Sequence, residues 1–301
     1  MRIAVLGAGG VGGYFGGRLA AAGSDVTFVA RGAHLAAMRA NGLRIVSALG
    51  DSTIDVKAVD DIAKVDSVDL IIVAVKLWDT ENVATTLKPL VDRGAAVVSF
   101  QNGVTKDDIL RAHVGADAVM GGVSYIAARI AEPGVIEHTG TMQRLVFGEF
   151  DGSRSPRAVA FLQACEAAKI GAELSTRIDR VTWEKFVFLV GLSGSTAFFH
   201  LPIGEIRIDP EKRAFLYDAM KETVAVGRAR GVALDASYAD DRLAFCDTLP
   251  EAMTSSMYTD LIRGNRLELP WLSGAVADMG REVGIPTPIN AQIVGALTAA
   301  C

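Results

Sequence analysis

The sequence predicts an α/β domain over residues 1–176 and an all-α domain over residues 177–301. Three observations lead to this division. A glycine-rich turn opens the chain directly after a short apolar run, strand-like and helix-like runs then alternate as far as residue 175, and only long helical patterns follow Arg177. Such alternation predicts a mostly parallel, doubly wound sheet that binds its ligands beyond the carboxyl ends of the strands.

The spacing of the first glycines predicts a dinucleotide site. The turn GAGGVG contains G-x-G-x-x-G, formed by Gly7, Gly9 and Gly12. In a Rossmann-type domain the first glycine permits the turn, the second leaves room for a pyrophosphate, and the third lets helix and strand pack closely. The helix that follows presents unpaired N–H groups and a partial positive charge to the phosphates. We expect Gly10 and Val11 to line the same cofactor site.

The residue after the second strand indicates which dinucleotide binds. Sites for NAD or FAD usually end this strand with Asp or Glu, which hydrogen-bonds the ribose hydroxyls. Here the strand at residues 25–29 leads to Ala30 and Arg31, without a carboxylate. A guanidinium pairs well with a 2′-phosphate through charge-assisted hydrogen bonds. The sequence therefore favours NADPH/NADP+ as the cofactor. The alternative is that Arg31 only caps a loop.

Strands and helices continue to alternate along the first domain. Residues 69–75 form a continuous apolar run bounded by charge, as in a parallel strand that is buried on both faces. Lys76 follows this strand and Asn102 follows the strand at 95–100, so both are placed where ligands bind. Ser155 is a candidate N-cap for a helix over 155–168. The other predicted strands lie at 43–46, 53–57, 118–127, 135–138, 144–149 and 172–175, and the other helices at 33–41 and 79–90.

Long helical patterns make up the predicted second domain, over residues 179–199, 210–230, 237–248, 268–283 and 290–299. The apolar stretch at 186–203 is interrupted by glycine, serine and histidine, and it is shorter than the ~20 strongly apolar residues of a membrane span. We interpret it as the central helix of this domain.

Composition excludes several classes of function. The 301 residues carry a net charge of −5 without a run of Lys or Arg, so neither nucleic acid nor membrane is expected as a partner. Three cysteines and four histidines are scattered without the spacing of a disulfide framework or a metal site, and no metal is expected. These features predict a soluble, cytoplasmic protein. The sequence does not determine the oligomeric state, and a homodimer stays open.

One lysine has an unusual position in the second domain. Lys185 lies early in the long apolar helix, within the sequence TWEKF. Reduction of a carbonyl by hydride transfer needs a group that supplies a proton or positive charge to the oxygen. A lysine whose pKa is lowered by burial or a neighbouring charge can do both. The alternative is a lysine that snorkels from a helix end.

Six pieces of sequence, in this order, carry a family resemblance: GAGGVGGYFGGRLA at 7–20, VAR at 29–31, VAVK at 73–76, QNG at 101–103, WEK at 183–185 and SSMYTDLIRGNRLELPWLSG at 255–274. Together they resemble the ketopantoate reductase family (2-dehydropantoate 2-reductases), over essentially the whole chain. The resemblance implies a Rossmann-type domain and a helical domain of the 6-phosphogluconate dehydrogenase C-terminal type. It also implies NADPH-dependent reduction of ketopantoate to pantoate, a step towards pantothenate.

The resemblance implies roles for individual residues. Lys185 matches the family's proton donor to the keto oxygen, and Glu268 matches a glutamate that helps to hold substrate and lysine. Asn102 matches an asparagine near nicotinamide and substrate. Lys76 matches a lysine at the cofactor site.

Two further matches lie in the segment 255–274. Ser256 matches a serine that contacts the substrate carboxylate, and Asp260 matches an acidic residue of the same segment, which we also expect to bind substrate. Each assignment has an alternative in local structure. Ser256 can serve only as a helix cap, and Glu268 can lie in the first turn of a helix, where a carboxylate is favoured.

The chain also departs from the family pattern. Asparagines that follow the catalytic lysine by one and two helical turns are Leu189 and Ser193 here, and Gly194 replaces a proline. A third family asparagine, three residues before the binding serine, is Met253. The resemblance assigns these amides to polar groups of the substrate, including its terminal hydroxyl. A site built to bind a hydroxyl discriminates strongly against substrates that lack it, so this half of the site is expected to differ.

Three hypotheses follow. The leading one is an NADPH-dependent reductase of a small-molecule 2-oxo acid, with ketopantoate as substrate. The second is a related reductase of a less polar 2-oxo acid or another small carbonyl, which Leu189 and Met253 favour. The third is a non-catalytic NADP-binding sensor.

Overall fold

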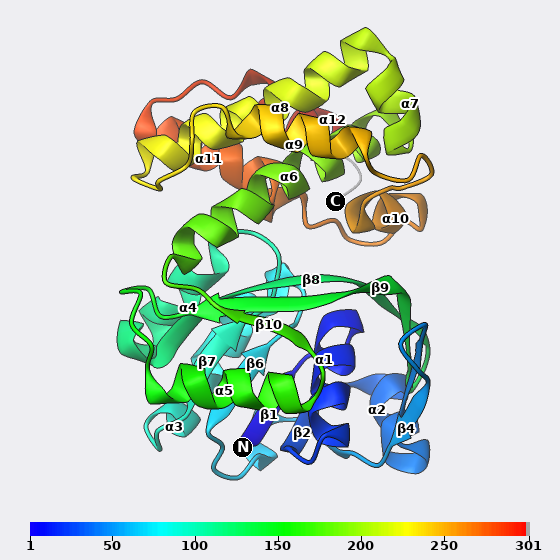
Figure 1. Cartoon of the computed structure of the whole chain (residues 1–301), viewed down its shortest axis with the longest axis vertical. Helices are drawn as coiled ribbons and strands as arrows, with labels where there is room; N and C mark the ends of the chain where they lie inside the picture. The colour runs from blue at the N-terminus through cyan, green and yellow to red at the C-terminus, as the bar shows by residue number, and fades with distance from the viewer. Residues whose placement is uncertain (299–301) are drawn as a thin grey trace. The chain divides into compact units, whose positions relative to one another are not determined.

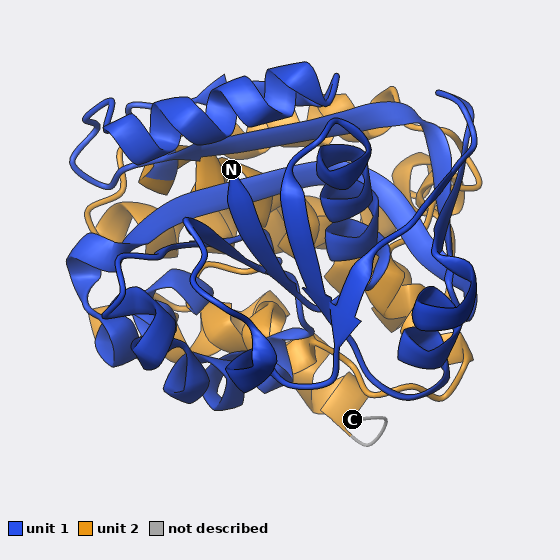
Figure 2. Ribbon diagram, turned by 90° about the horizontal axis from the view of Figure 1, so that it is seen from below, with its two compact units in different colours: residues 1–102, 106–178 blue, residues 103–105, 179–301 orange. Residues whose placement is uncertain are grey.

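The structure is a computed structural model that describes residues 1–298 (Figure 1). It divides into two compact units, shown in different colours in Figure 2. Unit 1 comprises residues 1–102 and 106–178, and unit 2 comprises residues 103–105 and the chain from residue 179 onward. Within the described part of the chain, no helix has both the length and the apolar character of a membrane span, in agreement with the interpretation of the stretch at 186–203.

Unit 1 is built on a sheet with the strand order β4-β3-β9-β8-β7-β6-β1-β2-β5, and β10 pairs with β9. Parallel pairs join the strands from β5 through β2, β1, β6 and β7 to β8. The pairs β8–β9 and β3–β4 are antiparallel, so the mostly parallel sheet is confirmed with these two exceptions. The strands are β1 Arg2–Leu6, β2 Asp25–Val29, β3 Leu43–Ser47, β4 Ser52–Ile54, β5 Lys57–Val59, β6 Leu70–Val73, β7 Ala96–Ser99, β8 Val119–Glu132, β9 Val135–Gly148 and β10 Gly171–Leu174.

Both faces of the parallel strands are buried, because alternate residues enter two separate cores. Ile3 and Val5 belong to one core, which includes side chains of α1 (Gly10–Ala21) and α5 (Pro156–Ala167). Ala4 and Leu6 belong to the other, formed with α3 (Thr80–Val91) and α4 (Lys106–Val114). All residues of β6 and β7 are buried, as their continuous apolar runs predict.

Local signals explain where several helices of unit 1 begin and end. The predicted N-cap Ser155 is confirmed, since its hydroxyl accepts a hydrogen bond from the N–H of Ala158 and Pro156 stands in the first turn. Helix α2 (Gly32–Asn41) ends at Gly42, whose φ of 75° suits a residue without a Cβ.

Unit 2 is helical. Its longest helix, α6 (Ile178–Phe199), packs closely on its neighbours because it contains small residues. A Cβ added to Gly191 would lie 2.6 Å from Met220, and one added to Gly194 would lie 2.7 Å from Ile293. The other α-helices are α7 Ile203–Ile208, α8 Pro210–Ala229, α9 Tyr238–Asp247, α10 Ser256–Ile262, α11 Ser273–Val283 and α12 Pro288–Leu297.

The structure corrects two predictions for the strands. The strand predicted at 53–57 is two strands, because β4 pairs with β3 whereas β5 pairs with β2. The separate strands predicted at 135–138 and 144–149 are one strand, β9, which continues through Gly140. Strand β8 is also longer than predicted. The pairing of β8 with β9 contains two shifts of register, and the pattern of apolar residues in a sequence does not reveal such bulges.

The helix predicted at 268–283 is broken. A 3₁₀ turn, η4 (Leu269–Trp271), precedes α11, and Leu272 between them has non-helical φ and ψ of −107° and −103°. Pro270 stands in the first turn of η4, where a proline is tolerated, so it does not explain the break at Leu272 two residues later. Helices α4, α7 and α10 were not predicted. Helices α7 and α10 have six and seven residues, too few to display a helical period, and α4 has nine residues, of which five are charged or histidine.

Candidate functional site

In unit 1 the carboxyl ends of β1, β2, β6 and β7 meet at one edge of the sheet, because these strands are parallel neighbours. Hydrogen bonds join the chain segments that leave this edge: the N–H of Gly7 donates to Val29 O at 3.1 Å, and that of Phe100 donates to Val73 O at 3.0 Å. The edge brings together the residues predicted for the cofactor: Gly7, Gly9, Gly10, Val11, Gly12, Arg31, Lys76 and Asn102.

The three motif glycines have different surroundings, and those of Gly7 and Gly12 fit the turn and the close packing expected of them. Gly7 has a φ of 94°, and an added Cβ would lie 2.7 Å from the main-chain nitrogen of Val75. A Cβ on Gly12 would lie 2.1 Å from the carbonyl oxygen of Gly7, so only glycine lets α1 approach β1 here. Gly9 is the N-cap of α1, and a Cβ there would meet nothing within 4 Å. Space therefore lies next to the helix N-terminus, where a pyrophosphate fits.

Gly10 satisfies a packing requirement that the motif alone did not indicate. An added Cβ at this position would lie 2.1 Å from the carbonyl oxygen of Ala128 in β8. The first turn of α1 therefore lies against the main chain of β8, and Gly10 permits that approach.

Two cationic side chains are exposed at this edge. Arg31 is the N-cap residue of α2, but its side chain makes no capping hydrogen bond. Lys76 follows β6, and its Nζ lies 5.5 Å from the centroid of the Trp78 ring. Exposed cations beside a helix N-terminus fit an anionic ligand such as a phosphorylated nucleotide.

A buried amide connects the segments that follow β6 and β7. The Nε2 of Gln101 donates to Val75 O at 2.9 Å and to Thr80 Oγ1 at 2.8 Å, and its Oε1 accepts from Ser99 Oγ at 2.9 Å. The Thr80 hydroxyl in turn donates to Leu77 O. Gln101 is only 7% exposed, so these bonds form away from water. They connect the segment that carries Lys76 to the residue before Asn102.

A buried ion pair supports the same region from α4. The Nζ of Lys106 donates to both carboxylate oxygens of Asp107 at 2.8 Å and to Ser99 O at 3.2 Å. Both side chains are almost completely buried, and burial raises the pKa of Asp107 while the Lys106 ammonium opposes that rise. Ser99 is therefore held through its main chain by Lys106 and through its side chain by Gln101.

In unit 2, Lys185 occupies a half-buried position on α6, two residues after the buried Trp183. Leu189 and Thr196 follow it by four and eleven residues, so at 3.6 residues per turn all three lie on one side of the helix. The neighbouring Glu184 accepts a hydrogen bond from Arg180 at 2.6 Å.

The end of this row of side chains is bonded to the segment that carries Ser256. The Oγ1 of Thr196 lies 2.9 Å from the Oγ of Ser255, which is also the N-cap of α10 and accepts from the N–H of Tyr258 at 3.0 Å. The alternative in which Ser256 caps the helix is therefore wrong, because Ser255 does so. Ser256 is the first residue of α10, and its side chain is exposed.

The two acidic residues predicted in this segment have distinct environments. Glu268 is 8% exposed and precedes η4 without a capping hydrogen bond from its side chain, so the alternative that places it in the first turn of a longer helix is wrong. Asp260 lies in α10, where its carboxylate accepts from Asn265 Nδ2 at 3.0 Å. Its main-chain carbonyl also receives the N–H of Asn265.

The positions that depart from the family pattern lie in apolar surroundings. Leu189 and Met253 are half-buried and pack against the core of unit 2. Ser193 is completely buried, and its hydroxyl has no hydrogen-bond partner among the described residues. Where the resemblance leads us to expect three asparagines, the chain thus has two apolar side chains and one short hydroxyl.

Three polar residues in these networks received no role from the sequence. The sequence singled out Gln101 only as part of the QNG motif. Ser255 adjoins a serine that was assigned, and the sequence did not distinguish a cap from a ligand between the two. Thr196 carried one signal, its spacing of three helical turns from Lys185.

Comparisons with known proteins agree with this architecture. Residues 3–152 match the family described as Ketopantoate reductase PanE/ApbA, and residues 177–300 match Ketopantoate reductase PanE/ApbA C terminal. A 2-dehydropantoate 2-reductase of Halobacterium salinarum is 32% identical over 291 residues, which cover 96% of this chain and 95% of the relative. An uncharacterized oxidoreductase, YkpB of Bacillus subtilis, is 29% identical over 96% of this chain and 95% of its own.

The fold is also similar to that of solved structures. The crystal structure of a 2-dehydropantoate 2-reductase from Geobacter metallireducens superposes with a TM-score of 0.92 and 29% identity, and the match covers 100% of both chains.

The surroundings of Gly12 and Gly9 predict different effects for substitution by alanine: one variant loses stability, and the other loses cofactor affinity. Gly12→Ala places a methyl group against the carbonyl of Gly7 and should lower the free energy of unfolding by about 1–3 kcal/mol. Gly9→Ala meets no protein atom, so the protein should remain as stable as wild type, within about 0.5 kcal/mol. It should nevertheless weaken binding of the nicotinamide cofactor tenfold or more, or ~1.4 kcal/mol. Urea unfolding and nucleotide titration check both expectations. A Gly9→Ala variant with unchanged affinity for the nicotinamide cofactor would contradict the expectation that this space holds the pyrophosphate.

The Gln101 network predicts a large effect from an isosteric change. Gln101→Glu replaces the donating NH₂ group with an oxygen that faces Val75 O, so the free energy of unfolding should fall by about 1–3 kcal/mol and NADPH binding should weaken. Gln163→Glu, at an exposed position on α5, is the matched control and should change neither quantity. Chemical denaturation and NADPH titration measure the two effects, and equal behaviour of the two variants would count against this network.

Proposed function

The chain belongs to the ketopantoate reductase family PanE/ApbA, and from this premise we propose that it uses NADPH to reduce 2-dehydropantoate (ketopantoate) to pantoate in pantothenate biosynthesis. Family membership makes it an oxidoreductase that depends on a nicotinamide cofactor and converts 2-oxo acids to 2-hydroxy acids. The preference for NADPH, the identity of the acid and the roles of individual residues are the content of the proposal.

The cofactor half of the proposal assigns the edge of unit 1 to NADPH. The free space at Gly9 accepts the pyrophosphate, and the exposed guanidinium of Arg31 pairs with the 2′-phosphate. Lys76 adds positive charge, and Asn102 bonds nicotinamide and substrate through its amide. Gly10, Val11 and the other motif residues shape the turn. Bound in this way, the nicotinamide supplies the hydride.

The substrate half assigns the chemistry to unit 2. Lys185 donates the proton to the keto oxygen, and Glu268 helps to keep the lysine charged and oriented until the transfer. Ser256 donates a hydrogen bond to the substrate carboxylate. Asp260 holds the turn after α10 through Asn265 and thereby supports the segment that carries Ser256.

The observation that carries this assignment is the hydrogen bond between Thr196 and Ser255. It joins the side of α6 that contains Lys185 to the residue before Ser256, although the two segments are about 60 residues apart. A proton donor and a carboxylate-binding hydroxyl must both reach one small acid. This bond, about 16 Å along α6 from Lys185, attaches the segment before Ser256 to the helix that carries the lysine.

Leu189 and Met253 favour a second candidate function, the reduction of a less polar 2-oxo acid. Both side chains extend the apolar core of unit 2 and offer no hydrogen bond to a substrate hydroxyl. A branched 2-oxo acid without that hydroxyl has no polar group to leave unpaired there.

Turnover assays test the proposed reaction. Lys185→Ala should lower kcat with ketopantoate by about 100-fold or more, because a positioned general acid contributes a factor of that order. Its affinity for NADPH should be unchanged. Lys221→Ala, at an exposed lysine of α8 that pairs with Asp218, should retain the wild-type kcat.

The same assay separates the two substrates. A higher kcat/KM for ketopantoate than for the branched 2-oxo acid without the hydroxyl supports the leading proposal, and the reverse order supports the second candidate. Binding of NADPH without turnover of any 2-oxo acid in a panel would contradict both.

Arg31 provides the test of cofactor preference. Arg31→Ala should weaken NADPH binding by about 10- to 100-fold, the loss expected for a charge-assisted hydrogen-bonded pair, and should leave NADH binding unchanged. Arg39→Ala is the control, since this exposed arginine lies on the same helix and donates to Ala58 O. Equal losses for NADPH and NADH in Arg31→Ala would mean that the side chain does not bind the 2′-phosphate.

A further inference from the structure

The segment at residues 248–255 connects α9 to α10 and leads directly to Ser256. It contains Met253, one of the positions that departs from the family pattern. The segment has no helix or strand of its own, so other parts of unit 2 must satisfy its main-chain groups. How it is held determines where Ser256 and Met253 are presented.

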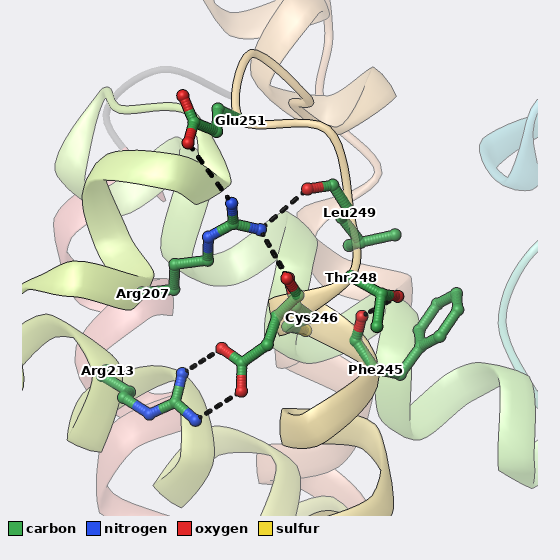
Figure 3. A network of polar contacts seen from close by, with 8 residues as sticks. Arg207, Arg213, Phe245, Cys246, Thr248, Leu249 and Glu251 are labelled. Atoms are coloured by element: carbon green, nitrogen blue, oxygen red, sulfur yellow. Dashed lines mark hydrogen bonds and ion pairs between the residues drawn. The ribbon is translucent and has the colours of Figure 1, made fainter.

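Arg207, in the short helix α7, is bonded to the start of this segment, as Figure 3 shows. Its Nη1 donates to the main-chain oxygens of Cys246 at 3.2 Å, Asp247 at 3.1 Å and Leu249 at 2.7 Å. Its Nη2 also lies 3.7 Å from the exposed carboxylate of Glu251. The side chain is only 16% exposed. A cation at this place suits the C-terminal carbonyls of α9.

The main chain of α7 holds the next part of the segment. The N–H of Gly204 donates to Glu251 O, and that of Ile203 donates to Met253 O, both at 2.9 Å. These are N–H groups of the first turn of α7, which have no partner within a helix. The contact is close, because a Cβ added to Gly204 would lie 2.8 Å from the Cβ of Glu251 and 2.9 Å from its Cα and main-chain oxygen.

The far end of the segment is fixed from α6. The single proton of the Thr196 hydroxyl goes to Leu192 O at 2.7 Å, so the Ser255 hydroxyl donates to Thr196 Oγ1. Ser255 then uses a lone pair to accept the N–H of Tyr258. The Thr196 hydroxyl, the Ser255 hydroxyl and the N–H of Tyr258 therefore all have hydrogen-bond partners. The segment is anchored at both ends.

We infer that Arg207 is a positioning residue that holds the segment 248–255 in place, so that Ser256 meets the substrate carboxylate without prior ordering of the chain. The inference rests on the proposed function, in which Ser256 binds that carboxylate. A segment that is already ordered loses less entropy when the substrate binds, so the benefit appears in substrate affinity. The nucleotide site in unit 1 is not part of this arrangement.

Arg213 is a natural control for Arg207. It lies six residues further along the chain, in α8, and also reaches the end of α9 (Figure 3). Its guanidinium forms a bidentate pair with the Asp247 carboxylate, at 2.5 and 2.8 Å, and thus binds a side chain in place of the main-chain carbonyls that Arg207 binds. It is 32% exposed, so little stability is expected from the pair.

The test compares Arg207→Met, Arg207→Lys and Arg213→Met in the full-length protein with NADPH and ketopantoate. Arg207→Met should raise KM for the 2-oxo acid by about tenfold, because main-chain carbonyls lose a charged donor. The kcat should stay within about threefold of wild type, and the NADPH dissociation constant should be unchanged. Arg207→Lys should have a KM between those of wild type and Arg207→Met. It keeps the positive charge, but one ammonium cannot donate in all the directions of the guanidinium. Arg213→Met should behave as wild type.

Hydrogen exchange supplies a readout besides activity. In Arg207→Met the amides of residues 248–258 should exchange at least about tenfold faster, in line with the loss of about 1.4 kcal/mol of local protection. The amides of unit 1 should keep their rates. Unchanged exchange in this segment, or an equal change throughout the chain, would overturn the positioning role.

A second pair of variants perturbs the same contact without removing a charge. Gly204→Ala forces α7 away from Glu251 and should raise KM as Arg207→Met does. Gly295→Ala, in α12, meets no atom within 4 Å and should leave KM unchanged. This pair decides the question if Arg207→Met does not fold.

Ser256→Ala separates this inference from the function on which it rests. An unchanged KM in Ser256→Ala means that the assigned carboxylate contact is wrong, and the role of Arg207 falls with it. A raised KM in Ser256→Ala combined with a wild-type KM in both Arg207→Met and Gly204→Ala overturns only the role of Arg207.

Discussion

The close approach of main chain to main chain at Gly7 and Gly12 is the constraint on which unit 1 depends. A Cβ at either position would lie within 3 Å of main-chain atoms, so α1 can lie against β1 and the segment after β6 only if both residues are glycine. This approach directs the N-terminus of α1 towards the carboxyl edge of the sheet. The same edge receives the ends of β2, β6 and β7, and the nearby Gly9 leaves free space there. The edge that the proposal assigns to the nicotinamide cofactor is therefore a consequence of strand order and of glycine at these positions.

Buried hydrogen bonds perform the corresponding task for irregular segments. In unit 1, Gln101 satisfies carbonyl and hydroxyl groups on the two segments that leave β6 and β7. In unit 2, Thr196 and Arg207 bind the ends of the segment between α9 and α10. A buried polar group without a partner costs ~1–3 kcal/mol, so each of these networks specifies one arrangement strongly. Residues assigned to the chemistry, such as Asn102 and Ser256, follow directly after residues held in this way.

The two halves of the proposed reaction differ in how closely this chain follows its family. The glycine turn, Lys76, Asn102, Lys185 and Glu268, to which the proposal assigns cofactor binding and proton transfer, are all present in this chain. The positions assigned to the rest of the substrate carry leucine, serine and methionine where the family pattern has amides. In the second candidate function, such a combination keeps the reaction and alters the choice of acid, because hydride and proton transfer involve only the keto group and its carbon.

The sequence by itself determined the α/β and all-α architecture, the position of the glycine-rich turn and the family, because glycine spacing, apolar periodicity and short motifs are local properties. Strand Asp25–Val29 and the cap at Ser155 were predicted correctly for the same reason. Tertiary structure decided which strands pair, and so divided residues 53–57 between two partners and joined 135–148 into one strand. It also distinguished Ser255, the cap, from Ser256. Hydrogen bonds between residues far apart in the chain, such as that of Thr196 with Ser255, leave no periodic trace in either segment, and only the folded chain reveals them.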